Sequence, residues 1–106
     1  MASYPKQYRW VSARFDKVMK AHQKLGEAVL AAGPLRKKHA HLVQLAAAAG
    51  SRSEGAVHSH VRRALEAGAT PEEIYHALVL LVSTIGFPAA SAALSWAREA
   101  IEKKSK

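Results

Sequence analysis

The sequence predicts an all-α fold of five helices in one domain, and three observations support this. No segment alternates apolar and polar residues, and no Asn-Gly or Asp-Gly dipeptide marks a hairpin turn. Apolar residues instead recur at steps of three and four, which is the spacing of an amphipathic helix. Glycine, alone or beside proline, separates these segments, and 106 residues suit a single domain, residues 1–106.

The first expected helix lies within residues 1–32 and is basic and amphipathic. Lysines and arginines gather on the face opposite its apolar stripe, and Gly33-Pro34 ends it. Residues 1–40 carry nine basic residues against two acidic ones, a balance of +7. The apolar stripe consists of Tyr8, Val11, Phe15, Val18, His22, Leu25 and Val29.

The second and third helices are expected over residues 35–49 and 52–67. Gly50 stops the second helix, and the sequence from Ser51 to Glu54 matches a capping box that starts the third. Gly68 closes the third helix. The expected buried faces are Leu42, Leu45, Ala46 and Ala49 in the second helix and Val57, Val61 and Ala64 in the third.

The fourth and fifth helices are expected over residues 71–85 and 88–103. Thr70, Pro71 and Glu73 give the strongest helix start in the chain, a capping box with proline at the first helical position. Residues 78–82 are apolar all round, which predicts that the fourth helix is central and buried. Residues 86–88, Gly-Phe-Pro, separate it from an alanine-rich fifth helix, and both Trp10 and Trp96 are expected to serve in packing.

Composition excludes several kinds of chemistry and partner. The chain has no cysteine, so disulfide, zinc–thiolate and thiol peroxidase sites are excluded. The net charge of +8 favours an anionic partner, but aromatic residues do not interleave with the basic ones as a nucleic-acid stacking surface requires. An uncharged stretch runs from Tyr75 to Ala97, but the Gly-Phe-Pro break divides it, so we expect two packed helices of a cytoplasmic protein and no membrane span.

The chain has six histidines, and they are the most unusual feature among its reactive side chains. Two pairs have the spacing His-x-His, but side chains two apart on a helix point about 200° from each other, so no metal site is predicted from them. His60 shares the buried face of its helix and is either a core-edge histidine bonded to a carbonyl or a general acid/base. His41, at the edge of its face, is interpreted from position alone as a surface residue.

Four stretches carry a resemblance to a known family. They are residues 33–38 (GPLRKK), 42–47 (LVQLAA), 60–74 (HVRRALEAGATPEEI) and 86–88 (GFP), and the third is the most specific. The chain resembles the carboxymuconolactone decarboxylase family, which includes the AhpD-like proteins. The resemblance implies a five-helix AhpD-like bundle with its core in residues 33–104. It also implies assembly with copies of itself into a trimer or hexamer, with a pocket near or between subunits.

The resemblance also implies which site residues remain. Counting back from His60, the Cys-x-x-Cys of AhpD-like members falls at Ser53 and Ala56, and a relay glutamate falls at about His41. Thiol peroxidase activity is therefore not expected. The decarboxylase side of the family needs only an acid/base group and a cationic grip on carboxylates, which makes His60 and His41 candidate catalytic residues. The candidates for substrate binding are Arg52, Arg62 and Arg63.

One function is expected for this chain, and two alternatives to it remain open. We expect a small-molecule lyase or decarboxylase without a cofactor, acting on a small anionic substrate, with His41 and His60 paired across two helices. The first alternative is a non-catalytic binding or assembly protein that kept the scaffold and lost the chemistry. The second is an anion or nucleic-acid binder that works through the basic first helix.

Overall fold

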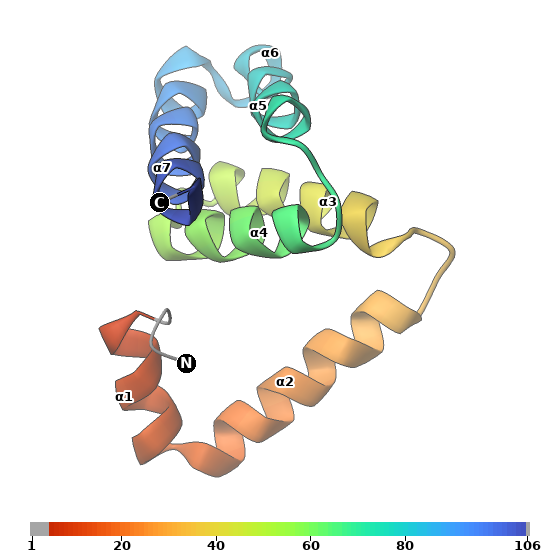
Figure 1. The fold of residues 1–106 in the computed structure, drawn as a ribbon, viewed down its shortest axis with the longest axis vertical. Coiled ribbons are helices and arrows are strands. Elements are labelled where there is room, and N and C mark those ends of the chain that lie inside the picture. Colours follow the sequence, from red (N-terminus) through yellow and green to blue (C-terminus); the bar gives the residue numbers. More distant parts are fainter. Residues whose placement is uncertain (1–4, 106) are drawn as a thin grey trace. The chain divides into compact units, whose positions relative to one another are not determined.

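The computed structural model describes residues 5–105, in which the regular structure is entirely helical (Figure 1). The chain forms two compact units, residues 1–34 and residues 35–106. None of the helices described has the length and apolar character needed to cross a membrane. The helices are α1 (Lys6–Arg14), α2 (Asp16–Ala31), α3 (Lys37–Gly50), α4 (Glu54–Glu66), α5 (Pro71–Val79), α6 (Val82–Ile85) and α7 (Phe87–Ser105).

The first predicted helix is two helices, so the prediction of one continuous helix is wrong. Phe15 leaves helical geometry with φ −126° and ψ 57°, while its N–H still donates to the Val11 carbonyl at 2.8 Å and closes α1. The Phe15 ring lies edge-on to Trp10, with 6.1 Å between ring centroids. Residues five apart on a continuous helix lie about 140° apart around its axis, so this contact depends on the break.

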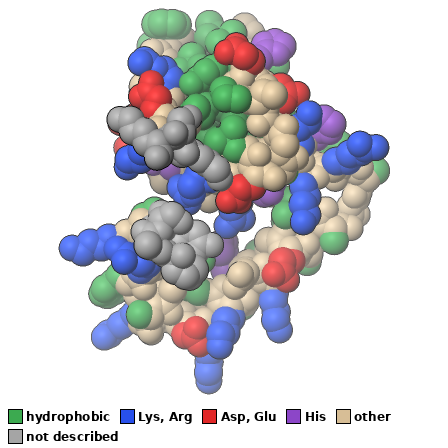
Figure 2. Space-filling view, in the orientation of Figure 1, with side chains coloured by type: hydrophobic (Ala, Val, Ile, Leu, Met, Phe, Trp, Pro, Cys, Tyr) green, Lys and Arg blue, Asp and Glu red, His purple; other side chains and the backbone are tan. Residues whose placement is uncertain are grey.

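The apolar stripe of the N-terminal unit is largely exposed in the chain. Leu25 is 59% exposed, and Val18 and Val29 are exposed as well. Trp10 is also exposed, so the packing role predicted for it is wrong beyond its contact with Phe15. Lys and Arg side chains project along these helices, as Figure 2 shows. An exposed apolar stripe on an otherwise basic helix pair marks a surface that can be covered.

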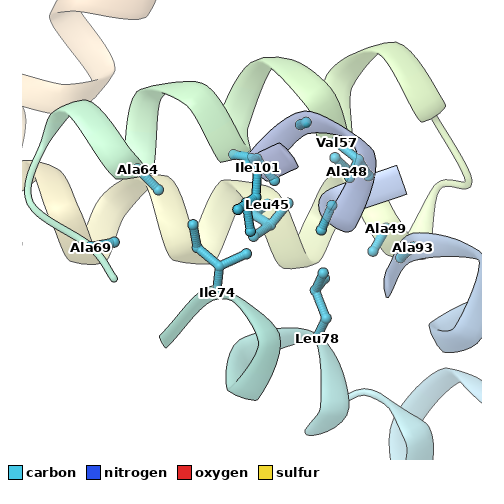
Figure 3. Close-up of a cluster of buried hydrophobic side chains, with 13 residues drawn as sticks. Leu45, Ala48, Ala49, Val57, Ala64, Ala69, Ile74, Leu78, Ala93 and Ile101 are labelled. Atoms are coloured by element: carbon cyan, nitrogen blue, oxygen red, sulfur yellow. The ribbon is translucent and has the colours of Figure 1, made fainter. Parts of the chain in front are cut away.

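The second unit has a small-residue core between α3, α4, α5 and α7. Helices α3 and α4 lie side by side, and Figure 3 shows Ile74 and Leu78 pointing from α5 toward this pair. The predicted buried face of the third helix is confirmed, and Leu45 and Ala49 of the second are buried as predicted. Trp96 packs against the core from α7. The cluster contains Leu45, Ala48, Ala49, Val57, Val61, Ala64, Ala69, Ile74, Leu78, Ala93, Ala97, Ala100 and Ile101.

The cap of α4 is displaced from the predicted one. Ser53, not Ser51, accepts the capping bond, with 3.4 Å between the Ala56 nitrogen and Ser53 Oγ. Ser51 instead donates its hydroxyl to the Ala48 carbonyl at 3.1 Å. Between them Arg52 has φ 58°, so the left-handed turn there shifts the start of the helix by two residues. The predicted Ser51–Glu54 capping box is therefore wrong.

The capping box at Thr70 is confirmed. The Glu73 N–H donates to Thr70 Oγ1 at 3.1 Å, and the Thr70 N–H donates to Glu73 Oε1 at 2.9 Å. The other carboxylate oxygen of Glu73 accepts from Lys38 Nζ at 3.1 Å. These hydrogen bonds of the Thr70 backbone and the Lys38 ammonium lower the pKa of Glu73. The start of α5 is thus tied to the start of α3.

The prediction of a buried fourth helix is wrong at its C-terminal end. Helix α5 ends at Val79, and the Leu81 N–H turns back to the Leu78 carbonyl at 3.0 Å before α6 begins. Leu78 is 0% exposed whereas Leu80 is 59% exposed. A run of apolar residues therefore contributes one face to the core and leaves the other at the surface. Gly86, with φ 97°, makes the predicted break before α7.

Candidate functional site

His41 of α3 and His60 of α4 meet across the paired helices. Their ring centroids lie 5.8 Å apart with the ring planes at 36°. His41 is only 5% exposed, so its interpretation as a surface residue is wrong, because α4 packs beside the face of α3 that carries it. His60 is partly buried. The structure therefore brings together the two histidines that the sequence selected.

Both rings carry an unsatisfied nitrogen. The Nδ1 atoms of His41 and His60 are buried and have no hydrogen-bond partner within the part of the chain that the structure describes. Within residues 5–105, no carbonyl accepts a hydrogen bond from His60, so the carbonyl-bonded interpretation of this residue finds no support. Buried polar atoms without partners are rare and costly in folded proteins. The two Nδ1 atoms are therefore exceptions to the usual pairing of buried polar groups.

The surroundings keep both imidazoles neutral. Burial lowers the pKa of His60 to about 4, helped by the nearby positive charge of Arg63 and by His41. Burial and then the Arg63 charge lower the pKa of His41, against an opposing hydrogen bond from the Gln44 side chain. At neutral pH both rings are therefore uncharged, and each binds a proton less readily than a free imidazole.

The three candidate arginines are placed differently. Arg63 lies one turn after His60 and acts electrostatically on both rings. Arg62 is partly buried, two positions from His60 and so about 200° around α4. Arg52 is exposed in the left-handed turn before α4. In the described range, only Arg63 of these three acts on the pair.

Two cavities lie elsewhere in the second unit, and neither is lined by His41 or His60. One, of about 460 Å³, is lined by Tyr75, Ser91, Leu94, Ser95 and Arg98. The other, of about 280 Å³, is lined by Glu54, Ser95, Trp96, Arg98, Glu99 and Glu102. His60, which is partly buried, is therefore not part of either cavity.

A second cluster of ligand-type side chains went unpredicted. Glu54, His58 and Glu99 each offer a ligand atom, and these atoms lie within 4.8 Å of one another. The i, i+4 spacing of Glu54 and His58 is visible in the sequence and places both side chains on one face of the helix. Nothing in the sequence brings Glu99 to them, because that contact depends on the packing of α7 against α4.

Comparison with known proteins identifies the scaffold. The model of the carboxymuconolactone decarboxylase family matches residues 16–99. The chain belongs to this family. It is also similar to the crystal structure of an apo carboxymuconolactone decarboxylase family protein from Legionella pneumophila. The TM-score is 0.79 at 28% identity, covering 94% of this chain and 88% of that one. The curated proteins contain no match to this chain.

This carboxymuconolactone decarboxylase family member lacks the thiols of its AhpD-like relatives. Ser53, at the first cysteine position, serves as the N-cap of α4, and Ala56, at the second, is partly buried. No other residue supplies a thiol, since the sequence contains no cysteine. Of the positions that the resemblance singled out, His41 and His60 are the two that lie together across α3 and α4.

Proposed function

We propose that this chain is a small-molecule lyase or decarboxylase without a cofactor, in which His60 performs acid/base chemistry on an anionic, lactone-like or enolisable substrate. The supporting observation is the His41–His60 pair, with two neutral rings 5.8 Å apart and two buried Nδ1 atoms without partners. A neutral imidazole can hydrogen-bond to the polar groups of a ligand, and it accepts a proton more readily once a bound anion offsets the nearby positive charge.

Electrostatics favour an anionic substrate. Arg63 presents a positive charge to both rings and disfavours their protonated forms. A carboxylate that binds beside Arg63 offsets this charge and makes protonation of His60 easier. Substrate binding is thus expected to bring a proton to His60.

That proton completes the reaction. On decarboxylation, the bond between the substrate and its carboxylate breaks, carbon dioxide leaves, and the electron pair passes into the conjugated carbonyl. The His60 imidazolium then donates its proton to the carbon of the resulting enolate and returns to the neutral form. His41 contacts His60 and positions it, in place of the relay glutamate of AhpD-like members.

We also propose that the chain assembles with copies of itself, as a trimer or hexamer. A neighbouring copy would cover His60, which is partly exposed and is not part of either cavity described above. The exposed apolar stripe of α2 is the surface available for such assembly.

A screen of small lactones and carboxylic acids tests the activity. Wild type is expected to convert a member of this class, and His60→Gln is expected to lose at least about 100-fold in kcat. His76→Gln, which alters an exposed histidine, serves as the matched control and keeps full activity. Equal activity of wild type and His60→Gln would overturn the role of His60.

The same panel separates the alternative, a non-catalytic binding or assembly protein. Such a protein would turn over no substrate, while NMR of its histidines would show His60 shifted by bound small acids or unaffected by all of them. The first result would indicate a site that binds small acids without turnover, and the second would favour a protein partner.

A further inference from the structure

We propose that Glu54, His58 and Glu99 form a divalent-cation site between α4 and α7, best suited to Zn²⁺. This site is separate from the histidine pair. His58 and His60 are two residues apart on α4, so their side chains leave the helix in nearly opposite directions.

The geometry places three ligand groups around one point. Glu54 and His58 lie one turn apart on α4, and Glu99 approaches from α7, so the ligand atoms fall within 4.8 Å of one another. Ligands at about 2.1 Å from a tetrahedral Zn²⁺ lie about 3.4 Å apart. The Glu99 side chain is 61% exposed, so a change of its rotamer can bring its carboxylate to this shorter distance from the other two ligand atoms.

The state of His58 is the second observation. Its Nε2 atom is buried and has no hydrogen-bond partner in the described structure. The nearest carboxylate oxygen, Glu99 Oε1, lies 3.6 Å away, which is too long for a hydrogen bond. A cation between these two atoms would satisfy both.

Glu54 is also free to act as a ligand. The sequence assigned its carboxylate to a capping box with Ser51, but Ser53 caps α4 instead. Within residues 5–105 the Glu54 carboxylate makes no hydrogen bond or ion pair. Two carboxylates held this close repel each other, and a divalent cation removes that repulsion.

The donor set and its surroundings select the ion. One imidazole favours zinc-like ions and two carboxylates favour harder ones, so the order of affinities places Zn²⁺ above Mn²⁺. Glu54 and Glu99 also line the cavity of about 280 Å³. Coordination positions not taken by the protein therefore face solvent, where water or a small anion can bind.

Calorimetric titration of the full chain with Zn²⁺ tests the site, together with the visible spectrum of Co²⁺ as a geometric probe. We expect saturable binding of a single ion per chain, weakened at least about tenfold in Glu99→Gln and His58→Gln. Glu102→Gln is the matched control, because Glu102 lines the same cavity but is not part of the trio. Zn²⁺ should raise the Tm of wild type and of Glu102→Gln, but not that of Glu99→Gln.

Two results would overturn the proposal. One is the absence of saturable binding by wild type. The other is binding that survives in Glu99→Gln and His58→Gln but is lost in His22→Gln or His39→Gln, which would place the ion elsewhere. Glu99 is exposed, so Glu99→Gln is expected to fold, and its circular dichroism spectrum checks this.

Discussion

His60 links its ionisation to folding. Its pKa is about 4 in the folded chain against 6.5 for a free histidine, because burial disfavours the charged ring. Above about pH 6.5 the ring is neutral in both states. As the pH falls from there, the unfolded chain binds a proton that the folded chain does not, so the folded state loses stability until the loss is complete near pH 4.

Replacing His60 should therefore flatten the pH dependence of stability. After a discount for the solvent that still reaches the ring, we expect wild type to lose about 1–2 kcal/mol through this residue between neutral pH and about pH 4. His60→Gln removes that part of the loss. Urea unfolding across this range, with His76→Gln as control, measures it, and parallel curves for wild type and His60→Gln would refute the linkage.

Arg63 sets the charge environment of the pair. Its positive charge is the second cause, after burial, of the lowered pKa of both His60 and His41. In Arg63→Gln the NMR titration midpoint of His60 should rise toward that of a free histidine, and that of His41 should rise with it. Arg62→Gln makes the same substitution on the other side of α4 and should leave the titration midpoints of both histidines unchanged. Equal shifts in the two variants would remove the specific role of Arg63.

Within one apolar segment, Leu78 and Leu80 are the same residue type but differ in burial, so they test how much burial contributes to stability. Leu78 of α5 is 0% exposed, while Leu80, just after it, is largely exposed. Leu78→Ala should lower the free energy of unfolding by about 2–5 kcal/mol, because it leaves a cavity in the core. Leu80→Ala should change it by less than about 1 kcal/mol. Chemical denaturation of both variants measures this, and similar losses would mean that Leu80 is covered in solution.

Some helix ends can be predicted from neighbouring residues and others cannot. The Thr70 box was predictable because Thr70, Pro71 and Glu73 act only on residues beside them. The breaks at Phe15 and after Val79 were not, because no glycine or proline stands there. At Phe15 a ring contact with Trp10 accompanies the break, and after Val79 the burial of one face ends. Neither signal is present in the periodicity of the sequence.

At the scale of the whole molecule, the exposed stripe of α2 is expected to hold copies of the chain together. Leu25→Lys places a charge in this stripe and should convert the proposed trimer or hexamer into smaller species. Gln23→Lys introduces the same side chain about 200° around the helix and should leave the assembly intact. Light scattering coupled to size-exclusion chromatography measures the mass. A wild-type monomer, or equal masses for both variants, would contradict the expectation.

The amino-acid sequence alone was enough to predict the all-helical fold, the family and the absence of thiol chemistry, and it singled out His60 as a candidate that stays a prediction. Each depends on local information: the spacing of apolar residues, the breaks at Gly68 and Gly86, residues 60–74, and the lack of cysteine. The packing of the helices set the features that depend on residues distant in the chain. It buried His41 against α4, placed Arg63 rather than Arg52 within electrostatic reach of the pair, and brought Glu99 to Glu54 and His58. Burial and electrostatic contact arise between elements, so the pattern within one helix cannot specify them.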